Sequence, residues 1–354
     1  MSADAVSKRR LLEIADLFDL APADAAVLLS QRHAGTFCYE IRAASSRYCL
    51  KLAATSHPVA RLETTLRIQK ALSDLGAPCA EPIPCGDEFQ VRLREGVATM
   101  SRWVDGEAPD HPSPKTMERI GAVAATLHSR FQLPTQTIWP PAMPTLDDLR
   151  SSVVRSLDDN LRRNAAPGVM TLLAVLDAVN SRIGFDPEGQ IGLIHGDLHH
   201  QNILMAPGHR CVLIDFDNCE RGLLAKDIGG ALYFAMDRSP FTSAKRMSSL
   251  LQGYGMVRQL SASEMAGTAQ HLRRKGLEIL AWTLLCFLRR RAPYHRVLSA
   301  ARRALAADGV ATALGIHHES LASIDWRDSM ATLPPKLSVL ARQLLSSEPP
   351  NTCG

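Results

Sequence analysis

The sequence predicts an α+β protein with two lobes, a small β-rich N-terminal lobe and a larger, mainly helical C-terminal lobe. Hairpin-like patterns occur twice in the first hundred residues, with one amphipathic helix between them. After Gly106, apolar residues recur at helical spacing, and only a short β-rich patch at 191–216 interrupts them. We therefore expect the lobes to comprise residues 1–104 and 105–354.

Each expected element of the N-terminal lobe follows from local residue patterns. Helices are expected at 8–19 and 60–75, and strands at 26–32, 37–43, 47–53, 89–93 and 97–104. Leu62, Leu66 and Leu72 give the second helix an apolar side, and Gly76 ends it. In the sequence, one predicted hairpin therefore precedes this helix and the other follows it.

The C-terminal lobe is expected to begin with a helix that starts at Ser113 and Pro114. A serine can cap the first backbone amides, and a proline fits the first turn, where no N–H is needed. A proline-rich loop at 133–144 separates this helix from two further helices near 146–163 and 168–183. The residues after the β-rich patch also read as helical.

The composition is that of an ordinary globular protein, with 46% hydrophobic residues, 21% charged residues and a net charge of +4. Such a small net charge does not predict a nucleic-acid partner. The N-terminal segment carries acidic residues, unlike a signal peptide, and the apolar run 279–288 is about half as long as a membrane-spanning helix. We therefore expect a cytoplasmic protein with no membrane partner. The eight cysteines form no CxxC pair, which favours buried free thiols.

Polar residues gather at the ends of apolar strand-like runs in the segments LIHGDLHHQNILM (193–205) and CVLIDFDN (211–218). Phosphoryl transfer needs a carboxylate that aligns the attacking hydroxyl and accepts its proton, a role that Asp197 fits. Mg²⁺ prefers oxygen ligands, which the side chains of Asn202 and Asp215 would provide. A hairpin between these two residues would bring them together.

The same residues carry a resemblance to the aminoglycoside phosphotransferase and choline kinase families and, more distantly, to the protein kinases. The shared pattern H-x-D-x-x-x-x-N appears as His195, Asp197 and Asn202, and an apolar strand then ends in Ile214 and Asp215. The resemblance implies a protein-kinase-like fold that binds ATP and Mg²⁺. It implies Asp197 as the catalytic residue and Asn202 and Asp215 as the metal ligands.

The N-terminal lobe agrees with this resemblance. SSRYCLKLA (45–53) is similar to the strand that carries the nucleotide-binding lysine, which would be Lys51, and Glu63 stands where the family's helix glutamate pairs with that lysine. The glycine-rich loop of protein kinases is missing. Backbone amides near Gly35 and Thr36 are expected to cover the phosphates instead.

ATMSRWVDGE (98–107) is similar to the family's hinge strand. Backbone groups between Met100 and Trp103, including Arg102, would pair with the edge of the adenine. Leu204 would form an apolar floor below the ring. These positions complete the implied nucleotide site.

We therefore predict an ATP-dependent enzyme that transfers the γ-phosphate to a hydroxyl group of a small molecule, a metabolite or an antibiotic. A bacterial Ser/Thr protein kinase of the same fold and a nucleotide-binding scaffold without turnover are the alternatives. The basic segment 267–303 is expected to be a solvated helical face, and a nucleic-acid-binding function would rest on it alone. The sequence leaves open the acceptor, the oligomeric state and the choice between ATP and GTP.

Overall fold

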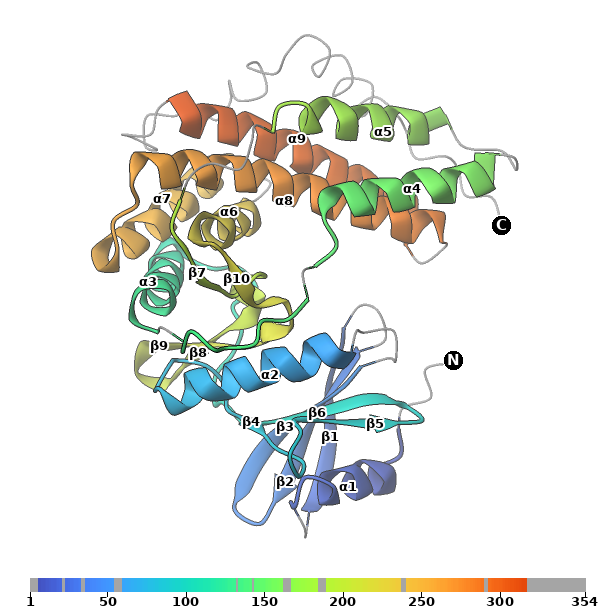
Figure 1. The fold of residues 1–354 in the computed structure, drawn as a ribbon, viewed down its shortest axis with the longest axis vertical. Helices are drawn as coiled ribbons and strands as arrows, with labels where there is room; N and C mark the ends of the chain where they lie inside the picture. Colours follow the sequence, from blue (N-terminus) through green and yellow to red (C-terminus); the bar gives the residue numbers. More distant parts are fainter. Residues whose placement is uncertain are drawn as a thin grey trace. The chain divides into compact units, whose positions relative to one another are not determined.

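A computed structural model describes residues 6–20, 23–32, 36–53, 59–131, 133–141, 143–161, 167–183, 189–236, 240–289 and 292–316. The chain forms two compact units (Figure 1). The first unit contains the described residues of 1–111, 129–141 and 195–221, and the second contains those of 112–128, 142–194 and 222–354. The predicted α+β class is confirmed. These two units do not coincide with the predicted lobes 1–104 and 105–354, because the segment 195–221 packs with the N-terminal strands.

A six-stranded antiparallel sheet forms the centre of the first unit, with strand order β1-β2-β3-β6-β4 and with β5 paired to β6. The strands are β1 (Ala23–Arg32), β2 (Thr36–Ala43), β3 (Ser46–Ala53), β4 (Pro82–Ile83), β5 (Gln90–Leu93) and β6 (Gly96–Arg102), and the helices are α1 (Lys8–Asp16) and α2 (Val59–Asp74). Both predicted hairpins are present. All five predicted strands are confirmed, and the short β4 is additional.

Helix α1 covers one face of this sheet. Leu11 and Ile14 of α1 are buried in one core cluster with Leu50, Leu52 and Met100 of the sheet. Since side chains alternate along a strand, the intervening residues of β3 lie on the opposite face. The packing of α1 therefore determines which β3 side chains remain available for a site.

An ion pair also joins α1 to the turn between β5 and β6. Arg10 Nε lies 3.0 Å from Glu95 Oε1. This guanidinium, by hydrogen bonding, lowers the pKa of the Glu95 carboxyl to about 2. The ion pair adds a charged contact to the apolar packing of α1.

Two short strands of the segment 195–221 attach it to the first unit. Strands β8 (Ile203–Ala206) and β9 (Arg210–Leu213) form a hairpin. The Leu213 amide donates to Pro78 O at 2.7 Å, and the Ala80 amide donates to Leu213 O at 3.1 Å. The hairpin is thereby hydrogen-bonded to the chain that leaves α2. The 3-10 helices η2 (His200–Asn202) and η4 (Phe216–Asn218) flank it.

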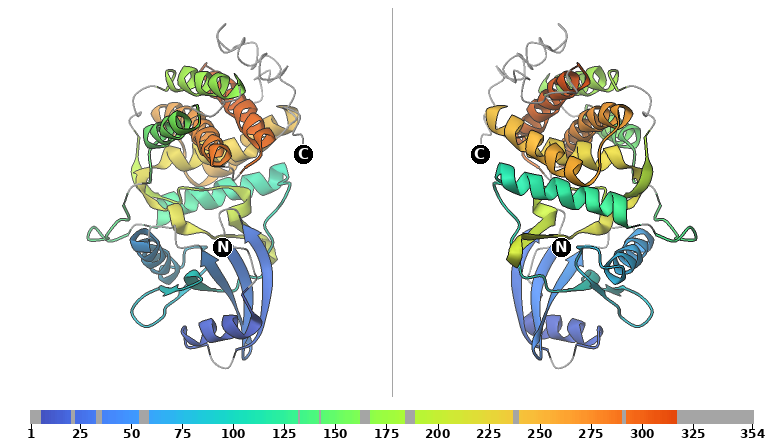
Figure 2. Two further views of the ribbon diagram at one scale, coloured as in Figure 1. Left: turned by 90° about the vertical axis from the view of Figure 1, so that its right-hand side faces the viewer. Right: turned by 90° about the vertical axis from the view of Figure 1, so that its left-hand side faces the viewer.

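Helices make up most of the second unit, and α8 is central among them (Figure 2). The helices are α3 (Pro114–Arg130), α4 (Leu146–Leu161), α5 (Pro167–Asn180), α6 (Leu224–Ala235), α7 (Pro240–Val257), α8 (Ala262–Leu288) and α9 (Tyr294–Ile316), and the short strands β7 (Ile191–Ile194) and β10 (Glu220–Leu223) pair with each other. Helix α8 contacts α4, α5, α6 and α9, and the apolar residues of α4, α5, α8 and α9 form one core. No described helix combines the length and the hydrophobicity that a bilayer crossing requires.

Part of the basic segment 267–303 is used inside the second unit. Arg273 is buried and donates to Asp308 at 2.8 Å, and Arg303 donates to the Tyr233 carbonyl at 3.1 Å. These arginines therefore stabilise helix packing. The segment is not simply the solvated face that the sequence predicts.

Helices α3 and α7 lie unusually close together. A Cβ added to Gly121 would meet Leu250 O at 1.9 Å, and one added to Gly253 would meet Glu118 O at 1.8 Å. Only glycine therefore fits at these two crossing positions. The C-terminal end of α3 also places His128 next to Asp227 of α6, with 3.1 Å between Nε2 and Oδ2 and both side chains fully buried.

Candidate active site

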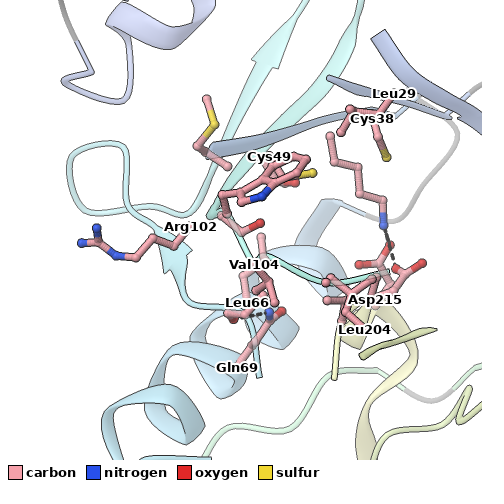
Figure 3. Close-up of a pocket in the computed structure, with 18 residues that line it drawn as sticks. Leu29, Cys38, Cys49, Leu66, Gln69, Arg102, Val104, Leu204 and Asp215 are labelled. Carbon is pink, nitrogen blue, oxygen red and sulfur yellow. Dashed lines mark hydrogen bonds and ion pairs between the residues drawn. The ribbon is translucent and has the colours of Figure 1, made fainter. Parts of the chain in front are cut away.

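The first unit contains a pocket of about 240 Å³ below its sheet (Figure 3). Its walls come from β1, β2, β3, β6, α2, the segment after β6, the β8–β9 hairpin and the residues that follow this hairpin. Small or apolar side chains predominate, among them Cys49, Leu66, Val104 and Leu204. Such a concave, mostly apolar space with a few charged groups at one side is typical of small-molecule sites.

Strand alternation places Lys51 in this pocket. Leu50 and Leu52 enter the core below α1, so Cys49 and Lys51 point to the other face. Thr99 of β6 is the register partner of Lys51, and it lines the same pocket. Cys49 and Lys51 therefore share the pocket face of β3.

Lys51 is held by two aspartates that lie more than 160 residues away in the sequence. Its Nζ lies 2.8 Å from Asp215 Oδ1 and 2.5 Å from Asp217 Oδ2. Burial lowers the pKa of the ammonium, but the charges of Asp217 and Asp215 outweigh this effect and raise the pKa above its usual range. Lys51 is therefore a fixed cation beside two carboxylates.

Asp215 follows β9 in an unusual backbone conformation. Its φ of 67° lies in the left-handed region, which non-glycine residues adopt rarely and at some cost in free energy. The Ile214 amide just before it donates to Asn202 O at 3.0 Å. The hairpin thus brings the two predicted metal ligands, Asn202 and Asp215, to the same end of the strands.

The loop that carries Asp197 is ordered by its own hydrogen bonds. Asn202 Nδ2 donates to Asp197 O at 3.0 Å and lies 3.5 Å from Asp197 Oδ2. His195 is fully buried, and its Nε2 lies 3.0 Å from Ile214 O, so this histidine links the loop to the Asp215 strand. His199 Nδ1 accepts the Gln201 amide, which leaves Nε2 as the protonated nitrogen, 3.4 Å from Asp197 Oδ2.

Gly196 allows the Asp197 loop to pass close to the segment after Asp215. Its φ is 79°, and an added Cβ would lie 2.0 Å from Asn218 O. Any larger residue would push the two backbones apart. The glycine of the motif is thus required by close approach as well as by its backbone conformation.

The donor set at this point fits a magnesium ion. Since Nδ2 of Asn202 is committed to Asp197, the atom of Asn202 that would face a cation is Oδ1. Mg²⁺ is usually held by one or two protein carboxylates together with phosphate oxygens and water. The described residues contain no group of three or more His, Cys, Asp or Glu that would form an all-protein metal cage.

Glu63 does not occupy its predicted position. It pairs with Arg67 one turn later in α2, at 2.8 Å, and accepts the Phe89 amide at 2.9 Å. The ion-pair partners of Lys51 are Asp215 and Asp217 instead. The predicted Lys51–Glu63 pair is therefore corrected: Glu63 lies on the flank of α2 that faces residue 89, whereas Leu66 lines the pocket.

The hinge differs in part from the prediction. Met100 and Arg102 are both among the residues that line the pocket. The Met100 side chain, however, is buried in the core under α1, and the Arg102 side chain extends away to Glu81 (Figure 3). The amides of Arg102 and Trp103 are engaged by Glu81 O and Arg47 O, at 2.8 and 3.0 Å. These two amides are therefore not available to an adenine.

The remaining predicted nucleotide contacts have mixed outcomes. Leu204 lines the pocket from β8, and its contact with an adenine ring stays a prediction. Thr36 is buried at the start of β2, and Gly35 lies outside the described residues. Sequence reasoning missed Arg61 and Gln69 of α2, because one buried polar residue in a helix has no signature of its own. Gln69 lines the pocket, and Arg61 contacts the segment after Asp215.

Comparisons with known proteins identify the family and the fold. The model of the phosphotransferase enzyme family matches residues 37–260. A homoserine kinase from Hyphomonas neptunium is 25% identical over 239 residues, which are 64% of this chain and 71% of that protein.

Solved structures share the fold. An amicoumacin kinase in complex with AMP-PNP, Ca²⁺ and Ami is similar with a TM-score of 0.63 and 16% identity, over 91% of this chain and 97% of that chain. A microcompartment-associated aminopropanol kinase has a TM-score of 0.57 and 18% identity, over 86% and 97%. These likenesses establish the fold. The family match, which covers more than half of the chain, establishes membership: this chain belongs to the phosphotransferase enzyme family and is a kinase that acts on a hydroxyl group.

Proposed function

We propose that the protein transfers the γ-phosphate of ATP to a hydroxyl group of a small molecule, with Mg²⁺ as the metal. The observation that carries the proposal is the meeting of Lys51 and Asp215 in one pocket, across 164 residues of sequence. A lysine beside a metal-binding aspartate is the arrangement that neutralises a bound triphosphate.

The phosphate-binding and metal-binding roles follow from the side chains in the pocket. Lys51 would contact the phosphates, and Asn202 and Asp215 would hold the metal, which when bound neutralises the phosphate charge. Val104 offers the next backbone amide along the hinge after those of Arg102 and Trp103, and it lines the pocket. We therefore assign the contact with the adenine edge to Val104 rather than to Arg102.

Asp197 would carry out the chemical step. Its Oδ2 already contacts His199 and Asn202, which hold the carboxylate in the loop. The hydroxyl oxygen forms a bond to the γ-phosphorus, the bond from that phosphorus to the β–γ bridging oxygen breaks, and ADP leaves. The proton of the hydroxyl goes to the Asp197 carboxylate.

An acceptor screen tests the proposal. ATP consumption should be measured over homoserine, amino alcohols, sugars, aminoglycosides, macrolides and generic protein substrates. We expect turnover with a small hydroxylated molecule and about 10²–10⁴-fold less turnover in Asp197→Asn, because a positioned general base typically contributes that much.

The matched control is Asp74→Asn, an aspartate on the exposed side of α2. This variant should retain wild-type turnover, and both variants should keep the wild-type melting temperature. Normal turnover in Asp197→Asn would contradict the assigned role. Phosphate incorporation into proteins alone would favour a protein kinase, and nucleotide binding without consumption over the whole panel would favour a scaffold.

A further inference from the structure

Arg61 is a buried arginine in the first turn of α2, with 5% of the residue exposed. Its Nε donates to Asp217 O and its Nη2 to Cys219 O, both at 3.2 Å. Its Nη1 donates to Pro141 O. One guanidinium therefore joins three chain segments that are distant in sequence.

The hydrogen bonds of Arg61 to described residues all go to main-chain oxygens. Burying a guanidinium without a carboxylate partner is costly in free energy, so a hydrophobic side chain would be the more stabilising choice at a purely structural position. A planar fork of donors, however, fixes the orientation of several peptide groups at once. Arg61 is therefore suited to holding backbone in place.

The backbone that Arg61 holds carries the candidate metal site. Asp217 and Cys219 lie in and just after η4, and Asp215, with its left-handed φ of 67°, lies immediately before it. Lys51 bonds the Asp217 side chain at 2.5 Å, while Arg61 bonds the carbonyl of the same residue. Two cations from different elements thus fix one short helix.

We propose that Arg61 is a positioning residue that ties α2 to the metal-binding loop, a link that Glu63 does not provide in this chain. The proposal rests on the function proposed above. Without Arg61, the peptide groups of Asp217 and Cys219 lose two donors, and the backbone that follows the strained Asp215 is held less firmly. The metal should then bind less tightly, although Lys51 and the pocket walls are unchanged.

The test compares Arg61→Gln and Arg61→Lys with Arg67→Gln, a matched control on the same helix whose arginine pairs with Glu63. Outer partners of metal ligands typically change metal affinity or activity by about 10–100-fold. We expect Arg61→Gln to raise the Mg²⁺ concentration for half-maximal activity by about tenfold and to lower kcat by about tenfold or more.

The KM for ATP at saturating Mg²⁺ should stay near the wild-type value. Arg61→Lys, which keeps the charge but loses the fork, should fall between the wild type and Arg61→Gln. Arg67→Gln should match the wild type in its Mg²⁺ dependence, its kcat and its KM for ATP. A lower melting temperature for Arg61→Gln with unchanged kcat and Mg²⁺ dependence would overturn the proposal, because it would show a purely structural role.

A second measurement needs no variant. In the wild-type protein, Mg²⁺ with a non-hydrolysable ATP analogue should slow hydrogen exchange in residues 61–65 and 216–219 together. Protection of 216–219 alone, or of neither segment, would overturn the coupling. If the wild type transfers phosphate to no acceptor, the proposed function fails, and calorimetry of Mg²⁺–nucleotide binding to the Arg61 variants still tests the positioning role.

Discussion

Replacement of Lys51 by methionine removes a positive charge that two neighbouring carboxylates in the pocket share. Asp215 and Asp217 each bond the same ammonium nitrogen, so their bonded oxygens lie at most about 5 Å apart. Their side chains are 22% and 31% exposed. The variant therefore leaves two like charges close together in a half-buried site.

This distance gives the approximate size of the repulsion between the Asp215 and Asp217 carboxylates. Two unit charges about 5 Å apart interact with about 3 kcal/mol at an effective dielectric constant near 20. Partial exposure reduces this value, so we expect Lys51→Met to lower the free energy of unfolding by about 1–3 kcal/mol at pH 7. Mg²⁺ at millimolar concentration should restore much of the loss, because it supplies a positive charge to the same carboxylates.

Urea unfolding with and without Mg²⁺ measures both effects. The matched control is Lys70→Met: Lys70 also contacts two acids, Asp74 and Glu81, but outside the pocket. This exposed pair should contribute less than about 1 kcal/mol and should show no Mg²⁺ effect. A Lys51→Met variant as stable as the wild type, or one that Mg²⁺ does not stabilise beyond its effect on the control, would refute the electrostatic reasoning.

Three other predictions follow from the site and its support. Gly196→Ala should lose more than about 4 kcal/mol of stability or fail to fold, because its Cβ would overlap a facing carbonyl, and circular dichroism melting would reveal it. ATP with Mg²⁺ should slow the alkylation of Cys38 and Cys49, which line the pocket, but not the alkylation of Cys85. Mass spectrometry of the labelled peptides measures this, and equal protection of all three cysteines would argue against this nucleotide site. The ion pair between Glu95 and Arg10 should stabilise the protein above pH about 4.5, and this stabilisation should be lost as the pH falls towards the folded-state pKa of Glu95, about 2. A neutral replacement of Arg10 should remove this part of the pH dependence of stability, as measured by urea unfolding at several pH values.

The sequence could predict those parts of the site in which local pattern determines geometry. Alternation along one strand places Lys51 on the pocket face, and the hairpin between Asn202 and Asp215 follows from two short apolar runs around a turn. Both predictions depend on residues that are near neighbours in the chain. Strand alternation was sufficient to predict the first feature, and the turn between two apolar runs was sufficient to predict the second.

The predictions that failed depend on how one element is rotated against another. Glu63 and Leu66 lie on the same helix, but whether either faces the pocket depends on the rotation of α2 about its axis. Nothing in the helix itself determines that rotation. For the same reason, the sequence did not indicate that Arg61 contacts the η4 backbone, or that Asp217 rather than Glu63 pairs with Lys51.

The hydrogen bonds between the chain around Pro78 and Leu213 have a consequence for how the first unit assembles. More than 130 residues separate the two partners, so these bonds close a long loop, and the entropy of that closure must be lost before the bonds form. A fragment that ends before residue 195 would retain Lys51 but none of the carboxylates that accompany it. The order of events during synthesis is thereby constrained, because the pocket cannot form until the ribosome has synthesised the segment 195–221.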